Sequence, residues 1–123
     1  EMEDYGNAER ALQDAYTLDP DDAQTSAYLA WSIYKNPGNQ RSQGALDKCR
    51  MLLSKSLQAE RNADAFAFRG WMLLDEGREG LAEGEFLKAL KLNPHQPHAQ
   101  GGMRLIKERR EAEKKGLFKR IFG

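Results

Sequence analysis

A repeated pattern of residues constrains this chain more than any other feature of its sequence. The string SAYLAW at residues 26–31 returns in related form as FAFRGW at residues 66–71, 40 positions further along. A second pattern, an alanine followed four and seven positions later by small or apolar residues, starts at Ala8, Ala45 and Ala82, in steps of 37 residues. Spacings of four and seven are typical of one face of a helix, and repeats of this length are typical of arrays whose stacked units bury a shared core. The sequence therefore predicts a stack of helix pairs.

Residues that break helices separate the repeated elements. Pro37 and Gly38 follow the first element, and Gly77 and Gly80 follow its second copy. Proline interrupts a helix and glycine accepts positive φ, so both stretches are expected to be turns. The acidic run at residues 19–22 ends one helix and offers N-cap residues for the next. We predict helices at about 4–17, 22–35, 42–59, 63–76, 79–92 and 97–115.

The last repeat contains a spaced series of aromatic, small and turn residues: Phe66, Gly70, Leu73, Ala82, Phe86 and Pro94. This series resembles the tetratricopeptide repeat (TPR), which has about 34 residues and the pattern W-x2-L-G-x2-Y…A-x3-F…P. Arg69 is the one clear departure, because the family has leucine there. The middle copy matches less well, with Cys49 at the aromatic position, and the first copy keeps only its second helix. The resemblance covers residues 5–96.

The resemblance implies an all-α fold, namely a TPR-type α-solenoid of antiparallel helix pairs with a C-terminal capping helix. On this interpretation residues 1–96 hold the second helix of one repeat and then two full repeats, at about 22–59 and 63–94. Residues 97–115 form the capping helix, and residues 116–123 form a basic aromatic tail. Because the chain begins without Met and inside an amphipathic pattern, we expect it to be a piece of a longer protein.

Charge and cysteine content exclude several classes of protein. The chain has 19 basic and 19 acidic residues, and this neutrality argues against nonspecific nucleic-acid binding by the whole chain. The charge is uneven, however: residues 1–22 carry eight acids against one base, and residues 104–120 carry eight bases against three acids. A lone Cys49 rules out an intramolecular disulfide and fits a reducing compartment, so a cytoplasmic location is expected.

The residues that could carry chemistry are too few and wrongly spaced for an enzyme. His95 and His98 form an H-x2-H pair, but a metal site needs a third or fourth ligand nearby, so we interpret them as loop histidines. Cys49 is expected to be a buried structural thiol. The glycines at 77, 80 and 84 match neither nucleotide-binding fingerprint. We therefore expect no catalytic residue, no metal and no cofactor.

The resemblance also implies where a partner binds, because the first helix of each TPR lines a concave groove. Trp31 and Trp71 occupy equivalent places in the two repeats, off the positions that the fold needs for its core. The alternative is that one or both tryptophans pack between helices. Aromatic side chains are favoured anchors in protein interfaces. The predicted partner-binding residues are Tyr28, Trp31, Tyr34, Phe68, Trp71 and Leu74.

The C-terminal part combines a weak point with an amphipathic end. Gly101 and Gly102 lower helix propensity, so the capping helix is expected to kink or fray there. Beyond it, apolar residues share one helical face and basic residues surround them. Three interpretations are open: the tail folds back as part of the cap, which we favour; it docks on another protein; or, least favoured, it touches an anionic membrane. The predicted docking residues are Leu117, Phe118, Lys119, Arg120, Ile121 and Phe122.

Taken together, these features predict a protein–protein interaction scaffold or adaptor that binds a partner helix or peptide in the concave groove. The alternatives are a homo-oligomerisation module and a weak membrane-surface adaptor acting through the tail. The tail is also loosely similar to the ends of multidomain bacterial proteins in which TPRs follow a J-domain or a signalling domain. That similarity implies a bacterial scaffold with a signalling or polarity protein, such as a small GTPase, as its partner.

Overall fold

The computed structural model describes residues 4–39 and 42–123, and every element of regular secondary structure in these residues is a helix. The predicted all-α class is therefore confirmed. Each predicted helix is found within one residue of its expected ends, except the last, which is seven residues longer (97–122 against 97–115). The elements are α1 (Tyr5–Leu18), α2 (Ala23–Lys35), a short 3-10 helix η1 (Pro37–Asn39), α3 (Gln43–Ala59), α4 (Ala63–Asp75), α5 (Glu79–Leu92) and α6 (Pro97–Phe122).

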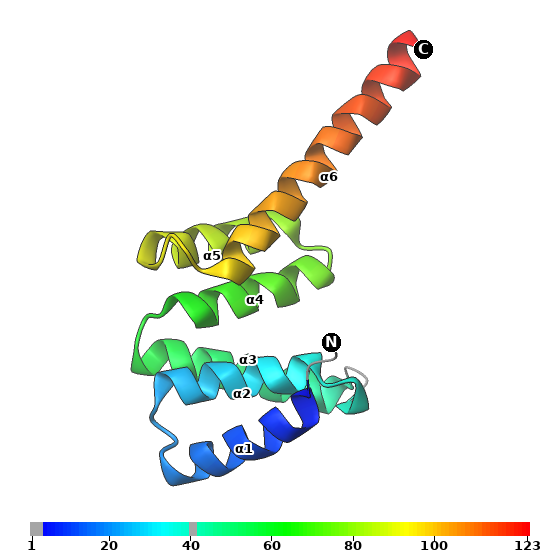
Figure 1. Cartoon of the computed structure of the whole chain (residues 1–123). Coiled ribbons are helices and arrows are strands. Elements are labelled where there is room, and N and C mark those ends of the chain that lie inside the picture. The colour runs from blue at the N-terminus through cyan, green and yellow to red at the C-terminus, as the bar shows by residue number, and fades with distance from the viewer. Residues whose placement is uncertain (1–3, 40–41) are drawn as a thin grey trace.

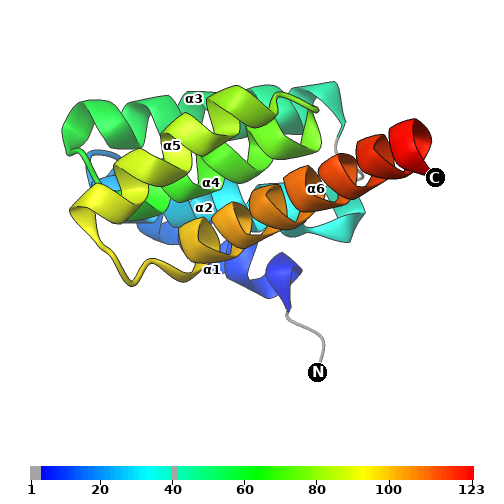
Figure 2. The same ribbon diagram turned by 90° about the horizontal axis from the view of Figure 1, so that it is seen from above.

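The helices stack in the order of the chain, with α1 at one end and α6 at the other (Figure 1). Each helix packs against the next, and in addition α2 contacts α4 and α4 contacts α6. The three even-numbered helices therefore lie side by side, with α4 in the middle. Seen from above, α6 runs beside α4 and α5, and its C-terminal end extends past them (Figure 2).

Short polar side chains fix where the helices begin. Asp4, Asp22, Ser42, Asn62 and Gln96 each accept a hydrogen bond from the backbone N–H three residues further on. Such N-caps satisfy one of the amide groups that have no partner inside the helix. The expectation that the acidic run at residues 19–22 supplies a cap is confirmed by Asp22.

The core consists of two clusters of buried side chains. The first joins α2, α3 and the near side of α4, and Leu29, Leu52 and Phe68 are at its centre. The second joins the far side of α4 to α5 and α6, and is built around Phe86 and Ile106. Because α4 contributes to both clusters, it connects the two halves of the stack.

Two glycines leave room for the ring of Phe86 between α4 and α6. A Cβ atom added to Gly70 would lie 2.5 Å from this ring, and one added to Gly102 would lie 2.3 Å from it. Closely packed interiors do not allow such short distances, so both helices come this near to α5 because they carry glycine here. The expectation that α6 kinks or frays at Gly101 and Gly102 is wrong: the helix is continuous, and Gly102 lets it pack.

The middle copy of the repeat, α2 with α3, packs its two helices together with different residues. Cys49 stands at the position equivalent to Phe86, and Ala30 stands at the position equivalent to Gly70. The Cys49 thiol donates to the Ala30 carbonyl oxygen at a sulfur–oxygen distance of 3.3 Å. A smaller side chain on α3 therefore accommodates a larger one on α2, which explains how the degenerate repeat keeps its core.

The thiol of Cys49 is expected to be unreactive in the folded protein. Its predicted burial is confirmed, and burial, reinforced by Glu9, raises its pKa to about 11. We expect a disulfide reagent at pH 8 to modify the native protein at least about 100-fold more slowly than the protein unfolded in guanidinium chloride. The absorbance of the thiolate that the reagent releases measures both rates. Equal rates would contradict this burial.

The same pKa shift predicts how stability depends on pH. The folded-state pKa lies above the ordinary thiol value of about 8.5, so this group stabilises the fold fully below that pH. Its contribution is lost as the pH rises toward about 11.

Candidate protein-binding surface

Four rings meet where α2, α4 and α6 come together. Trp31 of α2 stacks on Phe68 of α4, with ring centroids 4.6 Å apart and an angle of 13° between the planes. Tyr28 approaches Phe68 edge-on at 5.5 Å, and His98 approaches Trp31 and Phe68 edge-on at 5.1 Å and 5.2 Å. We call Tyr28, Trp31, Phe68 and His98 the aromatic cluster. Stacked and edge-on pairs of this kind are favourable beyond the area that they bury.

The sequence brings these rings together through its repeat. Tyr28 and Trp31 are three residues apart on α2, so both lie on one side of that helix. Phe68 is the counterpart of Tyr28 in the next repeat, and it reaches the same face because α2 and α4 lie side by side. His98 comes from the first turn of α6.

A chain of hydrogen bonds fixes α6 beside this cluster. The Tyr28 hydroxyl donates to one oxygen of Asp64 at 3.2 Å, and the Gln96 amide donates to the other oxygen at 3.0 Å. The oxygen of the same Gln96 side chain accepts from the Ala99 N–H at 2.8 Å, as the N-cap of α6. Gln96 is buried, so its two bonds tie the start of α6 to the start of α4. Burial raises the pKa of Tyr28, and the Asp64 carboxylate raises it further.

Trp71 serves mainly to hold α6 in place. Its indole N–H donates to the backbone oxygen of His98 at 2.8 Å, and its ring meets Phe86 edge-on at 6.0 Å. The side chain is partly buried against the second core cluster. The alternative that a tryptophan packs between helices therefore applies to Trp71.

Three of the six predicted binding residues are buried in the chain itself. Phe68 is 0% exposed, Leu74 3% and Tyr34 6%, so the expectation that these side chains line an open groove is wrong. Tyr34 stacks on Trp31, with centroids 5.9 Å apart, and its hydroxyl donates to Asp75. Tyr34 and Phe68 are buried because α2 and α4 are close enough for their aromatic side chains to pack together, whereas Leu74 is buried in the second core cluster.

The part of this face that stays open is centred on Trp31. Tyr28 is 36% exposed, and Trp31 is exposed in part. The ammonium group of Lys35 lies 5.5 Å from the centroid of the Trp31 ring, close enough for a cation–π contact. Lys35 and Asp75 are both exposed beside these rings. An aromatic centre with charged neighbours is the usual composition of a protein interface.

Sequence reasoning missed His98 as a part of this surface and Gln96 as the buried side chain that holds α6 beside it. The interpretation of His98 as a loop residue is wrong, because it lies inside α6, whereas His95 does lie in the turn before it. The available signal was the recurrence of small residues: Gly70 lies 40 positions after Ala30 and Gly102 lies 32 positions after Gly70, which suggests a third helix of the same kind. Across residues 4–39 and 42–123, there is no group of three His, Cys, Asp or Glu side chains that could hold a metal ion.

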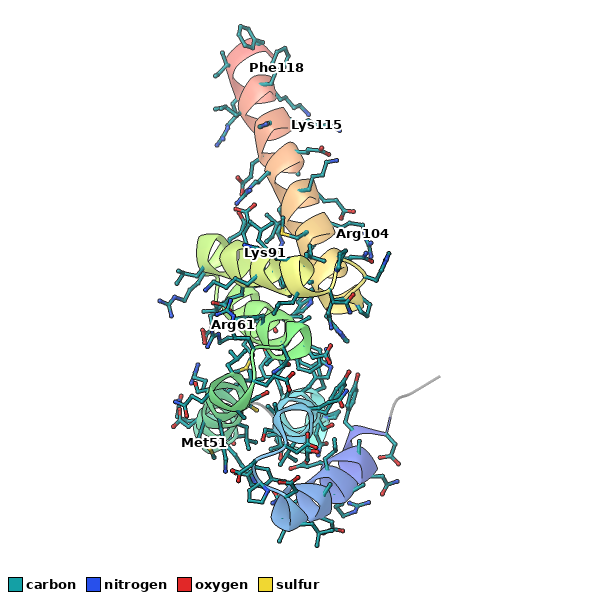
Figure 3. All side chains as sticks on the ribbon, turned by 90° about the vertical axis from the view of Figure 1, so that its left-hand side faces the viewer. Met51, Arg61, Lys91, Arg104, Lys115 and Phe118 are labelled. Carbon is teal, nitrogen blue, oxygen red and sulfur yellow. The ribbon has the colours of Figure 1, made fainter. Side chains whose placement is uncertain are left out.

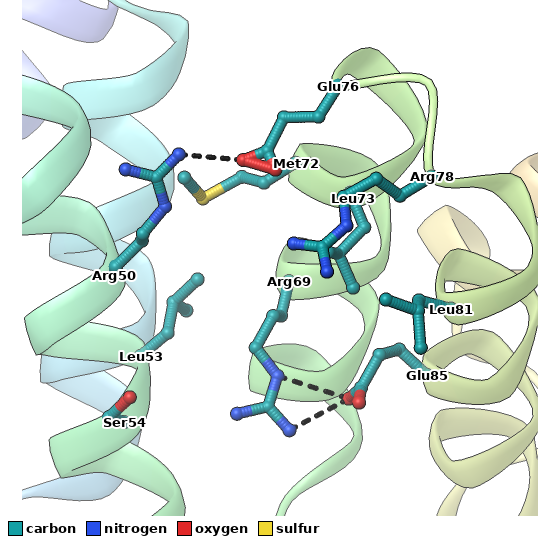
Figure 4. Close-up of a pocket in the computed structure, with 10 residues that line it drawn as sticks. All are labelled: Arg50, Leu53, Ser54, Arg69, Met72, Leu73, Glu76, Arg78, Leu81 and Glu85. Atoms are coloured by element: carbon teal, nitrogen blue, oxygen red, sulfur yellow. Dashed lines mark hydrogen bonds and ion pairs between the residues drawn. The ribbon is translucent and has the colours of Figure 1, made fainter. Parts of the chain in front are cut away.

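A hollow of about 360 Å³ lies on another side of the stack, between α3, α4 and α5 (Figure 4). Arg50 of α3 pairs with Glu76 at 2.6 Å, and Arg69 pairs with Glu85 at 3.0 Å. The second pair explains the departure from the TPR pattern, since Arg69 has its own partner on α5. These two pairs neutralise four of the charged side chains that line the hollow, and Arg78 adds a further positive charge. Its apolar lining comes from Leu53, Met72, Leu73 and Leu81.

Neither the models of protein families nor the curated proteins compared with this sequence give a match. Among the helices described above, none combines the length and the apolar character that crossing a membrane requires.

Proposed function

We propose that this chain is a scaffold of the TPR type that binds another protein. The order of antiparallel helix pairs supports the TPR-type solenoid, as does the contact between a small residue on the first helix and Cys49 or Phe86 on the second. On this proposal α6 takes the place of the first helix of a further repeat. It covers the apolar end of α4 and α5, as the capping helix of a repeat array must.

The partner is a helix or an extended peptide that lies across α2 and α4. The observation that carries this proposal is the setting of Trp31, whose ring rests on the buried ring of Phe68 while remaining partly open to solvent. A large side chain held in place before binding loses little entropy when a partner covers it. Trp31 and Tyr28 are therefore the anchors, and the charges of Lys35 and Asp75 set the orientation of the partner.

Two substitutions on this face should weaken binding without unfolding the chain. Trp31→Ala removes the main anchor, and Lys35→Glu reverses an exposed charge next to it. We expect each to reduce the amount of partner captured on immobilised protein by about tenfold or more, as measured by quantitative mass spectrometry. The matched control is Leu87→Ala with Leu92→Ala, which truncates two exposed apolar side chains on α5 and should leave capture unchanged. Circular dichroism verifies that all variants keep their helix content.

Amide hydrogen exchange of the complex then locates the partner. The proposal requires new protection in the Tyr28–Lys35 part of α2 and in α4. If only the amide groups around the hollow on α3 and α5 were protected, the partner would bind there instead, and this assignment would be overturned. Full capture by both Trp31→Ala and Lys35→Glu would overturn it as well.

A further inference from the structure

The C-terminal half of α6 stands clear of the rest of the molecule (Figure 1). Ile106 is the last buried side chain of this helix, and every residue from Lys107 onward is exposed. Arg110 makes the last bond to another helix among the described residues, to Glu83 at 2.9 Å and Glu79 at 3.3 Å. The favoured interpretation that the tail folds back over the last repeat is therefore wrong.

The end of this helix exposes a group of large apolar side chains. Successive side chains of a helix point about 100° apart around its axis. Four apolar side chains, Leu117, Phe118, Ile121 and Phe122, therefore fall within an arc of about 140°. Phe118 and Phe122 contact each other, with ring centroids 4.7 Å apart. An exposed apolar patch made by neighbouring residues usually marks a surface that something covers. The exposed fractions are 51% for Leu117, 65% for Phe118, 62% for Ile121 and 72% for Phe122.

Positive charge surrounds this patch on the same short segment. Residues 114–123 contain four basic residues and no acidic one. Lys115 and Arg120 lie beyond the two edges of the apolar arc, and Figure 3 shows Lys115 and Phe118 on the free part of α6. Long basic side chains can place their charged ends at the level of the lipid headgroups while their aliphatic parts lie beside the apolar groups that enter the membrane. This combination fits a flat, negatively charged surface with an apolar interior.

We propose that residues 114–122 bind the surface of a membrane that contains anionic lipid, with the apolar arc turned toward the acyl chains. The helix would lie in the interface and would not cross the bilayer. A protein groove suits the segment less well, because two to three turns of helix offer less than the area of about 800 Å² per partner that stable protein interfaces bury. The proposal is independent of the protein-binding function proposed above.

Vesicle sedimentation with the whole chain tests this proposal. We expect the chain to sediment with vesicles of phosphatidylcholine that contain about 40% phosphatidylglycerol, and at least about tenfold less with phosphatidylcholine alone. Phe118→Ser with Phe122→Ser removes most of the apolar contact, and Lys119→Glu with Arg120→Glu reverses two charges. Each pair should abolish sedimentation with the anionic vesicles.

Matched controls separate this segment from the rest of the chain. Leu87→Ser with Leu92→Ser makes the same kind of change on α5, and Lys107→Glu with Arg109→Glu reverses the same charge on α6 before the segment; both should keep most of the binding. Failure of the unmodified chain to bind anionic vesicles overturns the proposal. So does equal binding to the neutral vesicles, or binding that either segment variant retains. A protein captured by the chain but lost with both segment variants would assign the segment to a protein groove instead.

Discussion

Gly102→Ala is expected to lower the free energy of unfolding by about 2 kcal/mol, although alanine is normally the better helix former. The added methyl group would lie 2.3 Å from the ring of Phe86, which is itself fully buried. Overpacking of this kind costs about 1 to 3 kcal/mol, and here it outweighs the gain of up to about 1 kcal/mol in helix propensity. Urea denaturation followed by circular dichroism measures the difference.

Gly84→Ala is the control for this prediction, because a Cβ atom at Gly84 meets nothing within 4 Å. It should raise the free energy of unfolding by up to about 1 kcal/mol. The two alanine substitutions are thus expected to have opposite signs. A stability change of the same sign and size in both would mean that α6 does not pack on Phe86 as described. Adding Phe86→Leu to Gly102→Ala should recover part of the loss, since it opens space beside the new methyl group.

Phe68→Ala should have the largest effect on stability of any single change considered, a loss of about 3 to 5 kcal/mol. This ring is fully buried and touches Tyr28, Trp31 and His98, so its removal leaves a cavity where α2, α4 and α6 meet. The emission of Trp31 should also shift to longer wavelength, because water gains access to the ring.

The matched control is Phe118→Ala, at a phenylalanine that is 65% exposed. Exposed positions of this kind usually change stability by less than about 0.5 kcal/mol. Thermal unfolding of the two variants and the unmodified chain provides the comparison. If Phe68→Ala were as stable as Phe118→Ala, the aromatic cluster could not be the junction of the three even-numbered helices.

The helices themselves could be predicted because their signals are local. Pro37 and Gly77 interrupt the pattern, Asp22 caps a helix, and the spacing of small and apolar residues has the helical period. The predicted end of α6, at residue 115, is seven residues too early for an equally local reason. The apolar side chains that face the core stop near Ile106, but the residues that follow are mostly strong helix formers, and one glycine at Gly116 costs only about 1 kcal/mol.

The candidate surface could be predicted only in part, because it depends on contacts between helices. The sequence pointed to Tyr28 and Trp31 through their position on one side of α2. It could not indicate that Phe68 lies beneath Trp31 rather than beside it, since that depends on how closely α2 and α4 approach. The part played by Gln96 was equally hidden, because its amide finds Asp64 only after α6 has packed against α4.

The continuity of α6 has a mechanical consequence. One rigid rod of 26 residues, about 39 Å long, carries His98 in its first turn and Phe122 in its last. A tilt of about 5° at the first turn would displace the far end by about 3 Å. A change in how α6 is tilted on α4 and α5 would therefore move the tip that carries Phe122 farther than the first turn that carries His98.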